Sequence, residues 1–315
     1  MTALADADCS FALCLTHDVD RPYKTPFHAA YYALADRDPR HLRALAEDVN
    51  PYWQFETVTA LEDDLGVRSA WYFLSEPPLW RRSLREALSF DALVQEFGRY
   101  DVRDPPIADA MADLADGGWE VGLHGSYHAG SDRERLRTER DRIETVLDGP
   151  VRGGRQHYLN HDGARTWIHY QALGLEYDAS LGSSTDAGFE HGYGVRRPFD
   201  DDFVVFPLTL MEQHLPDPGE DFDAAWAVCE DLLAEAADND AVMTTLFHPR
   251  FFSERDFPGY RRLYERLIRE ANARGAWVGA PGECYDEFLA PPTGSQDAPA
   301  RSEEPASKST STATD

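Results

Sequence analysis

The sequence predicts an α/β protein, folded as a distorted (β/α) barrel of about seven units. Short apolar runs alternate along the chain with amphipathic stretches of helical period, which is typical of βα units around a parallel sheet. Glycines follow four amphipathic stretches, where a left-handed residue often ends a helix: Gly66, Gly149, Gly174 and Gly275. Seven or eight such units fit a barrel better than an open sheet, which remains the alternative.

Each strand is expected where a short apolar run lies between turn residues or helical stretches. These runs are Phe11–Leu15, Ser69–Leu74, Glu120–Leu123, Val151–Arg155, Leu175–Asp178, Phe203–Pro207, Val242–Phe247 and Ala276–Val278. The helices are expected at Phe55–Leu65, Ile107–Asp116, Ser131–Leu147, Ala164–Leu173, Asp221–Ala237 and Pro258–Arg274. The aromatic segment Arg21–Gln54 interrupts this order after the first strand, and we expect it to be an insertion over the barrel mouth.

Charge and composition restrict the class of protein. In 315 residues, 42% are hydrophobic and 12% aromatic, enough for a folded core, and the net charge is −27. This charge disfavours binding to nucleic acid or to an anionic membrane surface. Only Lys24 and Lys308 are lysines among 30 basic residues. Arginine-rich, strongly acidic composition is consistent with adaptation to high salt, and an ordinary acidic protein from a high-GC genome is the alternative.

The ends of the chain and its cysteines bear on location and domain organisation. The first residues contain no basic segment and no long apolar run follows, so we expect a cytoplasmic protein without signal peptide or transmembrane helix. The four cysteines form no Cys-x-x-Cys pair and are expected to be free thiols. Residues 1–290 are expected to form the barrel domain, and residues 291–315, which contain no aromatic residue, a disordered tail.

Two carboxylates stand at the end of the first predicted strand. Asp18 and Asp20 are two residues apart, so on a strand they point to the same side. Two like charges in one place favour either a cation between them or a raised pKa for one of them. The alternative is a polar strand end that merely leads into a loop.

Two histidines follow another strand end. In His124-Gly-Ser-Tyr-His128, the imidazoles would meet if a helical turn began at the strand end, and this spacing suits one divalent metal ion. Two histidines and one carboxylate, with open positions, are typical of a catalytic rather than a structural metal site. Two unrelated surface histidines are the alternative.

These segments resemble motifs of the polysaccharide deacetylase (NodB-homology) carbohydrate esterases, a family with a distorted (β/α) barrel. The family motifs Thr-Phe-Asp-Asp, His-Ser-x-x-His and Leu-x-His correspond, in order, to Thr16–Asp20, His124–His128 and Leu246–His248. The resemblance covers about residues 11–289. The first motif, Thr-His-Asp-Val-Asp, departs from the usual pattern and indicates a divergent branch.

The resemblance implies a role for each matching residue. Asp18 corresponds to the general base, His248 to the general acid, and Asp20, His124 and His128 to the metal ligands. This agrees with the chemistry of the residues, because a metal ion would activate water and polarise an acyl oxygen. A histidine could then protonate the leaving amine.

Two further residues correspond to weaker family motifs. Arg155 resembles the arginine that orients the base carboxylate, although the usual Arg-x-Pro is absent. Asp178 corresponds to an aspartate that tunes the catalytic histidine, although the neighbouring tryptophan of that motif is missing. The alternative for Arg155 is a surface arginine.

The sequence therefore predicts a metal-dependent hydrolase of a non-peptide C–N bond that deacetylates a sugar. The expected substrate is a small-molecule or lipid-linked sugar. The expected cofactor is a divalent metal, Zn²⁺ first, with Co²⁺, Ni²⁺ and Fe²⁺ also suited to these donors. The alternatives are an amidohydrolase on a non-sugar substrate and a non-catalytic glycan-binding barrel, which needs neither Asp18 nor His248. Candidate substrate contacts are Tyr127, His157, Tyr158, Arg197 and aromatic residues of the insertion.

Overall fold

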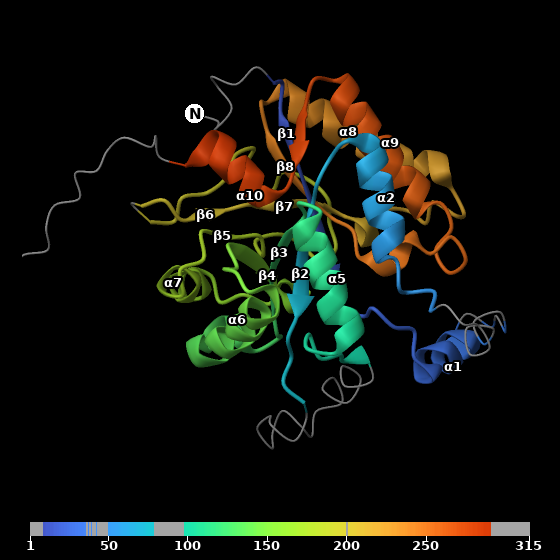
Figure 1. Ribbon diagram of the computed structural model, residues 1–315. Helices are drawn as coiled ribbons and strands as arrows, with labels where there is room; N and C mark the ends of the chain where they lie inside the picture. The colour runs from blue at the N-terminus through green and yellow to red at the C-terminus, as the bar shows by residue number, and fades with distance from the viewer. Residues whose placement is uncertain are drawn as a thin grey trace, which may run out of the picture.

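The computed structural model describes residues 9–35, 37, 39, 42, 50–78, 98–199 and 201–290. Within these residues one sheet of nine strands runs through the molecule (Figure 1). Its order is β6-β5-β4-β3-β2-β1-β8-β7, with β9 paired to β1, and all strand pairings are parallel. The strands are β1 Ala12–Val19, β2 Ala70–Leu74, β3 Glu120–Gly125, β4 Gly153–Gln156, β5 Tyr177–Asp178, β6 Val204–Val205, β7 Leu208–Met211, β8 Val242–Leu246 and β9 Trp277–Gly279.

Helices follow most strands and surround the curled sheet (Figure 1). Neighbouring helices touch in sequence order, α5 with α6, α6 with α7 and α8 with α9, while α2 contacts α9. The α-helices are α1 Pro26–Ala35, α2 Phe55–Leu65, α5 Pro105–Asp116, α6 Arg133–Leu147, α7 Ala164–Ala172, α8 Phe222–Asp238, α9 Tyr260–Ala273 and α10 Pro281–Cys284. The short helices are η3 Ala129–Ser131, η4 His157–Leu159, η5 Glu212–His214, η6 Pro249–Phe252 and η7 Tyr285–Leu289.

Strand β1 shows how the two faces of the sheet are used. Leu13 and Leu15 belong to the large apolar core between sheet and helices, whereas Ala12 and Cys14 belong to a separate core. Alternation along a strand places Asp18 on the same face as Ala12 and Cys14. The two-residue spacing of the acids therefore directs them away from the large core and into the sheet's concave side.

The predicted fold class is confirmed: the structure is a curled, barrel-like parallel sheet with helices. Helix α2 has the predicted bounds, and the other five predicted helices differ by one or two residues at their ends. Strand β1 is longer than predicted and continues through the polar Thr16–Asp18 segment. The sequence pattern did not predict α1, α10 or the short strand β7, which lies in the apolar run that follows Phe203.

One predicted helix end was wrong. Gly66, Gly174 and Gly275 have the expected positive φ angles of 69°, 82° and 80°. Helix α6 ends differently, because Asp148 takes the left-handed conformation at φ 52°. An aspartate tolerates this conformation better than most side chains, so Gly149 is not needed for it.

Parts of the inserted segment lie beside the end of β1. Arg21 and Tyr52 line a small cavity with Asp18 and Asp20. Lys24, buried, pairs with Asp256 at 2.7 Å. The insertion is thus attached to both the first strand and the region after β8.

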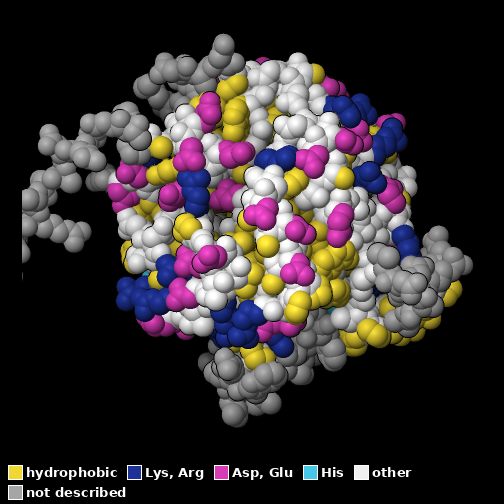
Figure 2. Space-filling view, in the orientation of Figure 1, with side chains coloured by type: hydrophobic (Ala, Val, Ile, Leu, Met, Phe, Trp, Pro, Cys, Tyr) yellow, Lys and Arg dark blue, Asp and Glu magenta, His cyan; other side chains and the backbone are white. Residues whose placement is uncertain are grey.

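Several other predictions concern the surface and the chain ends. Cys14, Cys229 and Cys284 are buried free thiols, and Cys9 is partly exposed. No helix in the described ranges is both long and apolar enough to span a membrane. On the face shown in Figure 2, acidic side chains are scattered among small groups of basic ones. The predicted tail, residues 291–315, lies outside the described residues.

Candidate metal and catalytic site

Six of the residues that the sequence pattern pointed to line one cavity of about 300 Å³. They are Asp18, Asp20, His124, His157, Tyr158 and His248. Each lies at or just beyond the carboxyl end of a parallel strand, namely β1, β3, β4 or β8. This is the edge at which barrel enzymes build their active sites, because loops from several strands meet there.

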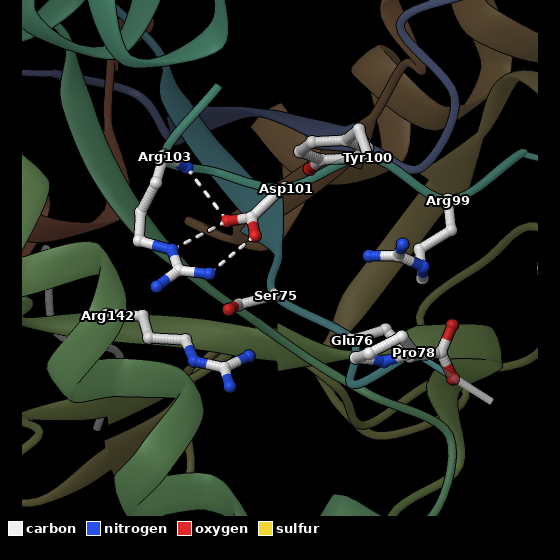
Figure 3. Close-up of a pocket in the computed structure, with 8 residues that line it drawn as sticks. All are labelled: Ser75, Glu76, Pro78, Arg99, Tyr100, Asp101, Arg103 and Arg142. Carbon is white, nitrogen blue, oxygen red and sulfur yellow. Dashed lines mark hydrogen bonds and ion pairs between the residues drawn. The ribbon is translucent and has the colours of Figure 1, made fainter. Parts of the chain in front are cut away.

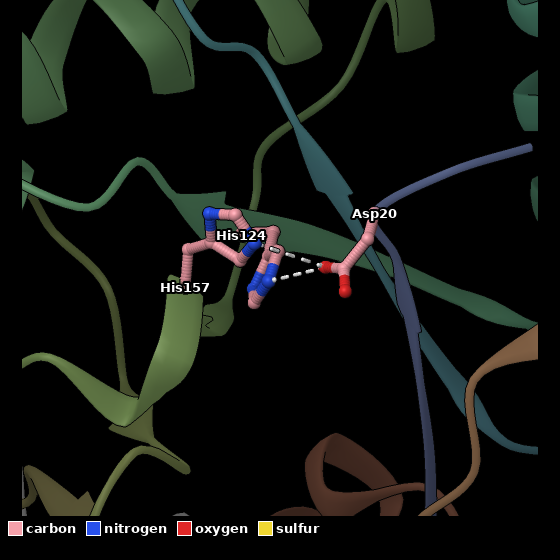
Figure 4. Close-up of side chains that lie close together, drawn as sticks. All are labelled: Asp20, His124 and His157. Carbon is pink, nitrogen blue, oxygen red and sulfur yellow. Dashed lines mark ion pairs between the residues drawn. The ribbon is translucent and has the colours of Figure 1, made fainter. Parts of the chain in front are cut away.

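Three of these side chains form a compact group, shown in Figure 4. Asp20, His124 and His157 each offer one ligand atom, and these atoms lie within 4.8 Å of one another. The Oδ1 atom of Asp20 lies 3.0 Å from His124 Nε2 and 3.6 Å from His157 Nε2. In the described part of the chain, this is the group of side chains arranged to hold a metal ion.

The hydrogen bonds of the cluster favour metal binding. His124 Nδ1 donates to the carbonyl oxygen of Arg155 at 2.9 Å, so when the ring is neutral its lone pair is on Nε2, facing Asp20. His124 Nε2 and Asp20 Oδ1 are both buried, and apart from their mutual ion pair at 3.0 Å neither has a hydrogen-bond partner. Buried polar atoms without partners are costly, and a cation between them would satisfy both. The donor set therefore fits a divalent metal such as Zn²⁺.

Electrostatics keep Asp20 ionised and His157 neutral, whereas for His124 the charges of Asp18 and Asp20 outweigh burial and raise the pKa, so a metal ion would displace a proton there. Burial raises the pKa of Asp20, but the nearby imidazoles of His248, His157 and His124 outweigh this and hold it well below its usual range. Burial, partly opposed by Asp20, lowers the pKa of His157 to about 3. His157 is consequently neutral at pH 7, the form in which an imidazole binds a metal.

A strained turn places His157 at the cluster. His157 follows β4 directly, and the next two residues, Tyr158 and Leu159, have left-handed φ angles of 58° and 55°. Such angles are unfavourable for side chains other than glycine and often occur at functional sites. The sequence analysis named His157 only as a candidate substrate contact, so its place among the ligand atoms is a correction.

The structure does not bring His128 to Asp20 and His124. The prediction assumed that a helical turn begins at the strand end, but His124 lies within β3 and η3 begins only at Ala129. His128 is exposed, and its ring packs edge-on against Tyr127. His157 occupies the third position of the cluster instead.

Asp18 is held by Arg155, as the sequence analysis expected. Arg155 Nη1 donates to Asp18 Oδ1 at 2.8 Å and to Thr16 Oγ1 at 2.9 Å, and both charged side chains are buried. Arg155 Nε donates to the carbonyl oxygen of Ala179. The other carboxylate oxygen of Asp18 lies 3.8 Å from His124 Nε2, which leaves it beside the metal cluster.

His248 has a buried carboxylate partner that the sequence analysis missed. Its Nδ1 atom lies 2.6 Å from Glu212 Oε1, while its Nε2 atom lies 3.2 Å from Asp20 Oδ2. Burial alone would lower the pKa of His248, but Glu212 and Asp20 raise it to about 9. Glu212 follows β7 immediately, and its only sequence signal is an acidic residue at the end of an apolar run.

The hydrogen bonds of Asp178 lead to residues other than His248. It accepts hydrogen bonds from Trp167 Nε1 at 3.1 Å and from Ser180 N and Oγ at 3.0 and 2.6 Å. Ser180 Oγ in turn accepts from the backbone of Gln156. Asp178 therefore fixes the β4–β5 edge, and the carboxylate that contacts His248 Nδ1 is that of Glu212.

A second buried network lies behind β1, on the helix side. Glu62 of α2 accepts hydrogen bonds from Ser69, Trp119 and Tyr264 and lies 3.0 Å from His17 Nε2. His17 also donates from Nδ1 to the carbonyl oxygen of Phe247, just after β8. This network explains why β1 continues through polar residues, and it anchors the strand that carries Asp18.

A second cavity, of about 150 Å³, contains none of the predicted site residues (Figure 3). Arg99, Arg103 and Arg142 line it, and Arg103 is held by both carboxylate oxygens of Asp101. Tyr100 connects this cavity to the sheet by hydrogen bonds to the backbones of Val19 and Leu74.

Comparison with solved structures identifies the fold. A protein assigned as a polysaccharide deacetylase from Mycobacterium smegmatis aligns with TM-score 0.58 and 16% identity, over 90% of this chain and 91% of that one. The Puue allantoinase aligns with TM-score 0.57 and 12% identity, over 91% and 92%. A protein assigned as a polysaccharide deacetylase from Pseudomonas aeruginosa PAO1 aligns with TM-score 0.56 and 11% identity, over 91% and 93%. This chain has their fold.

Sequence comparison adds no closer relation. No protein-family model and no curated protein sequence matches the chain. At identities of 16% or less, the structural likeness concerns the fold, and the activity has to be argued from the site.

Proposed function

We propose that this protein is a metal-dependent hydrolase that removes the acetyl group from an N-acetylated sugar or sugar-containing precursor. The observation that carries the proposal is that Asp18 and His248 line the same cavity as the ligand cluster, each held by a buried partner of opposite charge. A binding pocket needs neither a positioned base nor a positioned acid.

The residues support a division of roles. Asp20, His124 and His157 would hold the metal ion, which when bound supplies Lewis acidity to water and to the acyl oxygen. Asp18, fixed by Arg155, accepts a proton from the attacking water. His248, whose pKa of about 9 keeps it protonated near neutral pH, donates a proton to the leaving nitrogen.

The same catalytic residues could also serve the alternative from the sequence analysis, an amidohydrolase with a non-sugar substrate. Asp18 and His248 would serve any amide whose nitrogen must be protonated, including a non-sugar amide. The Puue allantoinase among the fold neighbours makes allantoin a suitable test of that alternative.

The proposal is tested by incubating Zn²⁺-loaded protein in high salt with N-acetylglucosamine, a chitin oligomer and allantoin, and measuring acetate or allantoate release. We expect acetate from an acetylated sugar, its loss in Asp18→Asn, and its retention in His128→Ala, which alters an exposed histidine outside the cluster. Release of allantoate alone would replace the sugar by a non-sugar amide. Binding of the sugars without any release would favour the glycan-binding alternative.

A further inference from the structure

The catalytic cavity contains two arginines that the proposed mechanism does not use. Arg21 and Arg250 both line it, and both also line the small cavity beside Asp18 and Asp20. Both are partly buried. Because both side chains line the cavity, each guanidinium can contact a ligand that enters it.

Arg21 and Arg250 are near one another, because both line the small pocket formed with Asp18, Asp20 and Tyr52. Burial raises the pKa of the Tyr158 phenol, and the positive charges of Arg21 and Arg250 both oppose this increase. Burial and the same two charges also lower the pKa of His28 to about 4. Arg21 and Arg250 are far apart in the sequence, but their charges affect the same two neighbours. They therefore form one positively charged edge of the cavity.

Arg21 is fixed in place without a carboxylate partner. Its aliphatic stem passes over Gly98, where an added Cβ would lie only 3.1 Å from Arg21 Cγ, and its guanidinium hydrogen-bonds to Tyr158. No ion pair joins Arg21 to an acidic residue in the described part of the chain. By contrast, Arg152 is held between Glu176 and Asp286 at 2.7 Å from each.

The carboxylates of the cavity are already satisfied by other groups. Asp18 pairs with Arg155 at 2.8 Å, and Asp20 faces the imidazoles of the metal cluster. Arg250 Nη1 donates a long hydrogen bond of 3.4 Å to Asp20 Oδ2, so Arg250 is ion-paired with a carboxylate that also faces three imidazoles. Asp20 is shared between Arg250 and the imidazoles, and Arg21 has no carboxylate partner in the described part of the chain, so this edge keeps positive charge that an external anion could bind.

The protein as a whole gives an anion no attraction. Its net charge is −27, and acidic side chains are spread over the face shown in Figure 2. An anionic ligand must therefore gain its binding energy by direct contact, as guanidinium groups allow with carboxylate or phosphate oxygens. We propose that the substrate carries such an oxyanion, which Arg21 and Arg250 bind beside the scissile amide. This inference rests on the proposed hydrolase function of the same cavity.

The test uses ligands that contain no amide, so that it does not depend on hydrolysis. Glucose, glucuronate and glucose 6-phosphate differ only at C6, and their dissociation constants are measured by calorimetry at moderate salt. We expect the wild type to bind at least one anionic sugar about tenfold or more tightly than glucose. Arg21→Gln should reduce this preference to about twofold or less, and Arg269→Gln, an exposed arginine paired with Glu265, should keep it.

Each outcome decides the inference separately from the proposed function. Loss of the preference in Arg21→Gln supports it even if no acetylated sugar releases acetate, and the better anionic sugar identifies carboxylate or phosphate. Equal or absent binding of the three sugars overturns it even if acetate is released. A preference that survives in Arg21→Gln and in Arg250→Gln, with metal content checked because Arg250 contacts Asp20, places the anion elsewhere and also overturns it.

Discussion

The buried carboxyl of Glu139 makes a sharp prediction about stability and pH. Glu139 lies on α6 and accepts hydrogen bonds from Ser126 N at 2.9 Å and Ser126 Oγ at 2.5 Å, so it fixes the turn that follows His124. Burial raises its pKa from 4.5 to about 7, against the opposing effect of the Ser126 hydrogen bonds. The folded protein therefore prefers the neutral carboxyl.

The sign and size of the effect follow from this pKa. Because the folded pKa is raised, the stabilisation from the neutral form is complete below about 4.5 and is lost as the pH rises through about 7. At about 1.4 kcal/mol per pKa unit, the whole effect is about 3 kcal/mol, and roughly 2.5 kcal/mol of it develops between about pH 5 and pH 8.

The variant Glu139→Gln removes the titrating group and can keep both bonds, with its amide oxygen accepting from Ser126 N and its NH₂ donating to Ser126 Oγ. Urea unfolding at constant salt should show the variant gaining about 2.5 kcal/mol relative to the wild type from about pH 5 to pH 8. Glu134→Gln, exposed on the same helix, is the control and should show no such trend. A difference between Glu139→Gln and wild type that is independent of pH would refute the reasoning.

Three further substitutions test the site. Glu212→Gln should lower kcat by about 10- to 100-fold and move the loss of activity at alkaline pH to lower values, because Glu212 helps hold the His248 pKa at about 9; an unmoved alkaline limb in the pH profile would contradict this. Asp18→Asn should lower kcat by about two to four orders of magnitude with fold and metal content retained, and an unchanged rate would remove Asp18 from the mechanism. Asp178→Asn should lower the free energy of unfolding by about 1–3 kcal/mol in urea titrations, yet reduce kcat of the folded protein far less than Glu212→Gln; a larger loss of kcat would restore a catalytic role to Asp178.

Local patterns predicted the fold well because most elements bury one apolar face. Helix α2 follows its helical periodicity and ends at Gly66, whose amide bonds back to the last turn. Strand β1 was predicted too short, since Thr16, His17 and Asp18 read as a polar strand end. Their burial depends on Glu62 and Arg155, which are distant in the sequence, and periodicity within one strand cannot reveal such partners.

The sequence predicted the site residues whose positions depend only on where a strand ends. The spacing of Asp18 and Asp20 fixes their common face, and His124 and His248 lie at the ends of the strands expected to carry them. The third ligand position depends on a turn. Replacing the assumed helical turn after His124 by an extended exit moves His128 to the surface, and the left-handed turn at Tyr158 brings His157 inward.

Glu212 illustrates the same limit for a positioning residue. Its contact with His248 joins the ends of β7 and β8, and β7 is a short strand that the apolar run beginning at Phe203 does not separate from β6. The strand order of the sheet, with β7 beside β8, places an acidic residue at the end of β7 next to His248. The sequence alone does not reveal this order, so the family resemblance pointed to Asp178 instead.

The central claim is that Asp20, His124 and His157 form a metal site from which His128 is excluded. Protein purified in high salt without a metal-chelating column, incubated with Zn²⁺ and desalted, is analysed for metal by elemental analysis, with folding checked by circular dichroism. The account predicts about one equivalent in the wild type and in His128→Ala, and little or none in His157→Ala and Asp20→Ala. Full metal content in folded His157→Ala together with loss in His128→Ala would contradict it.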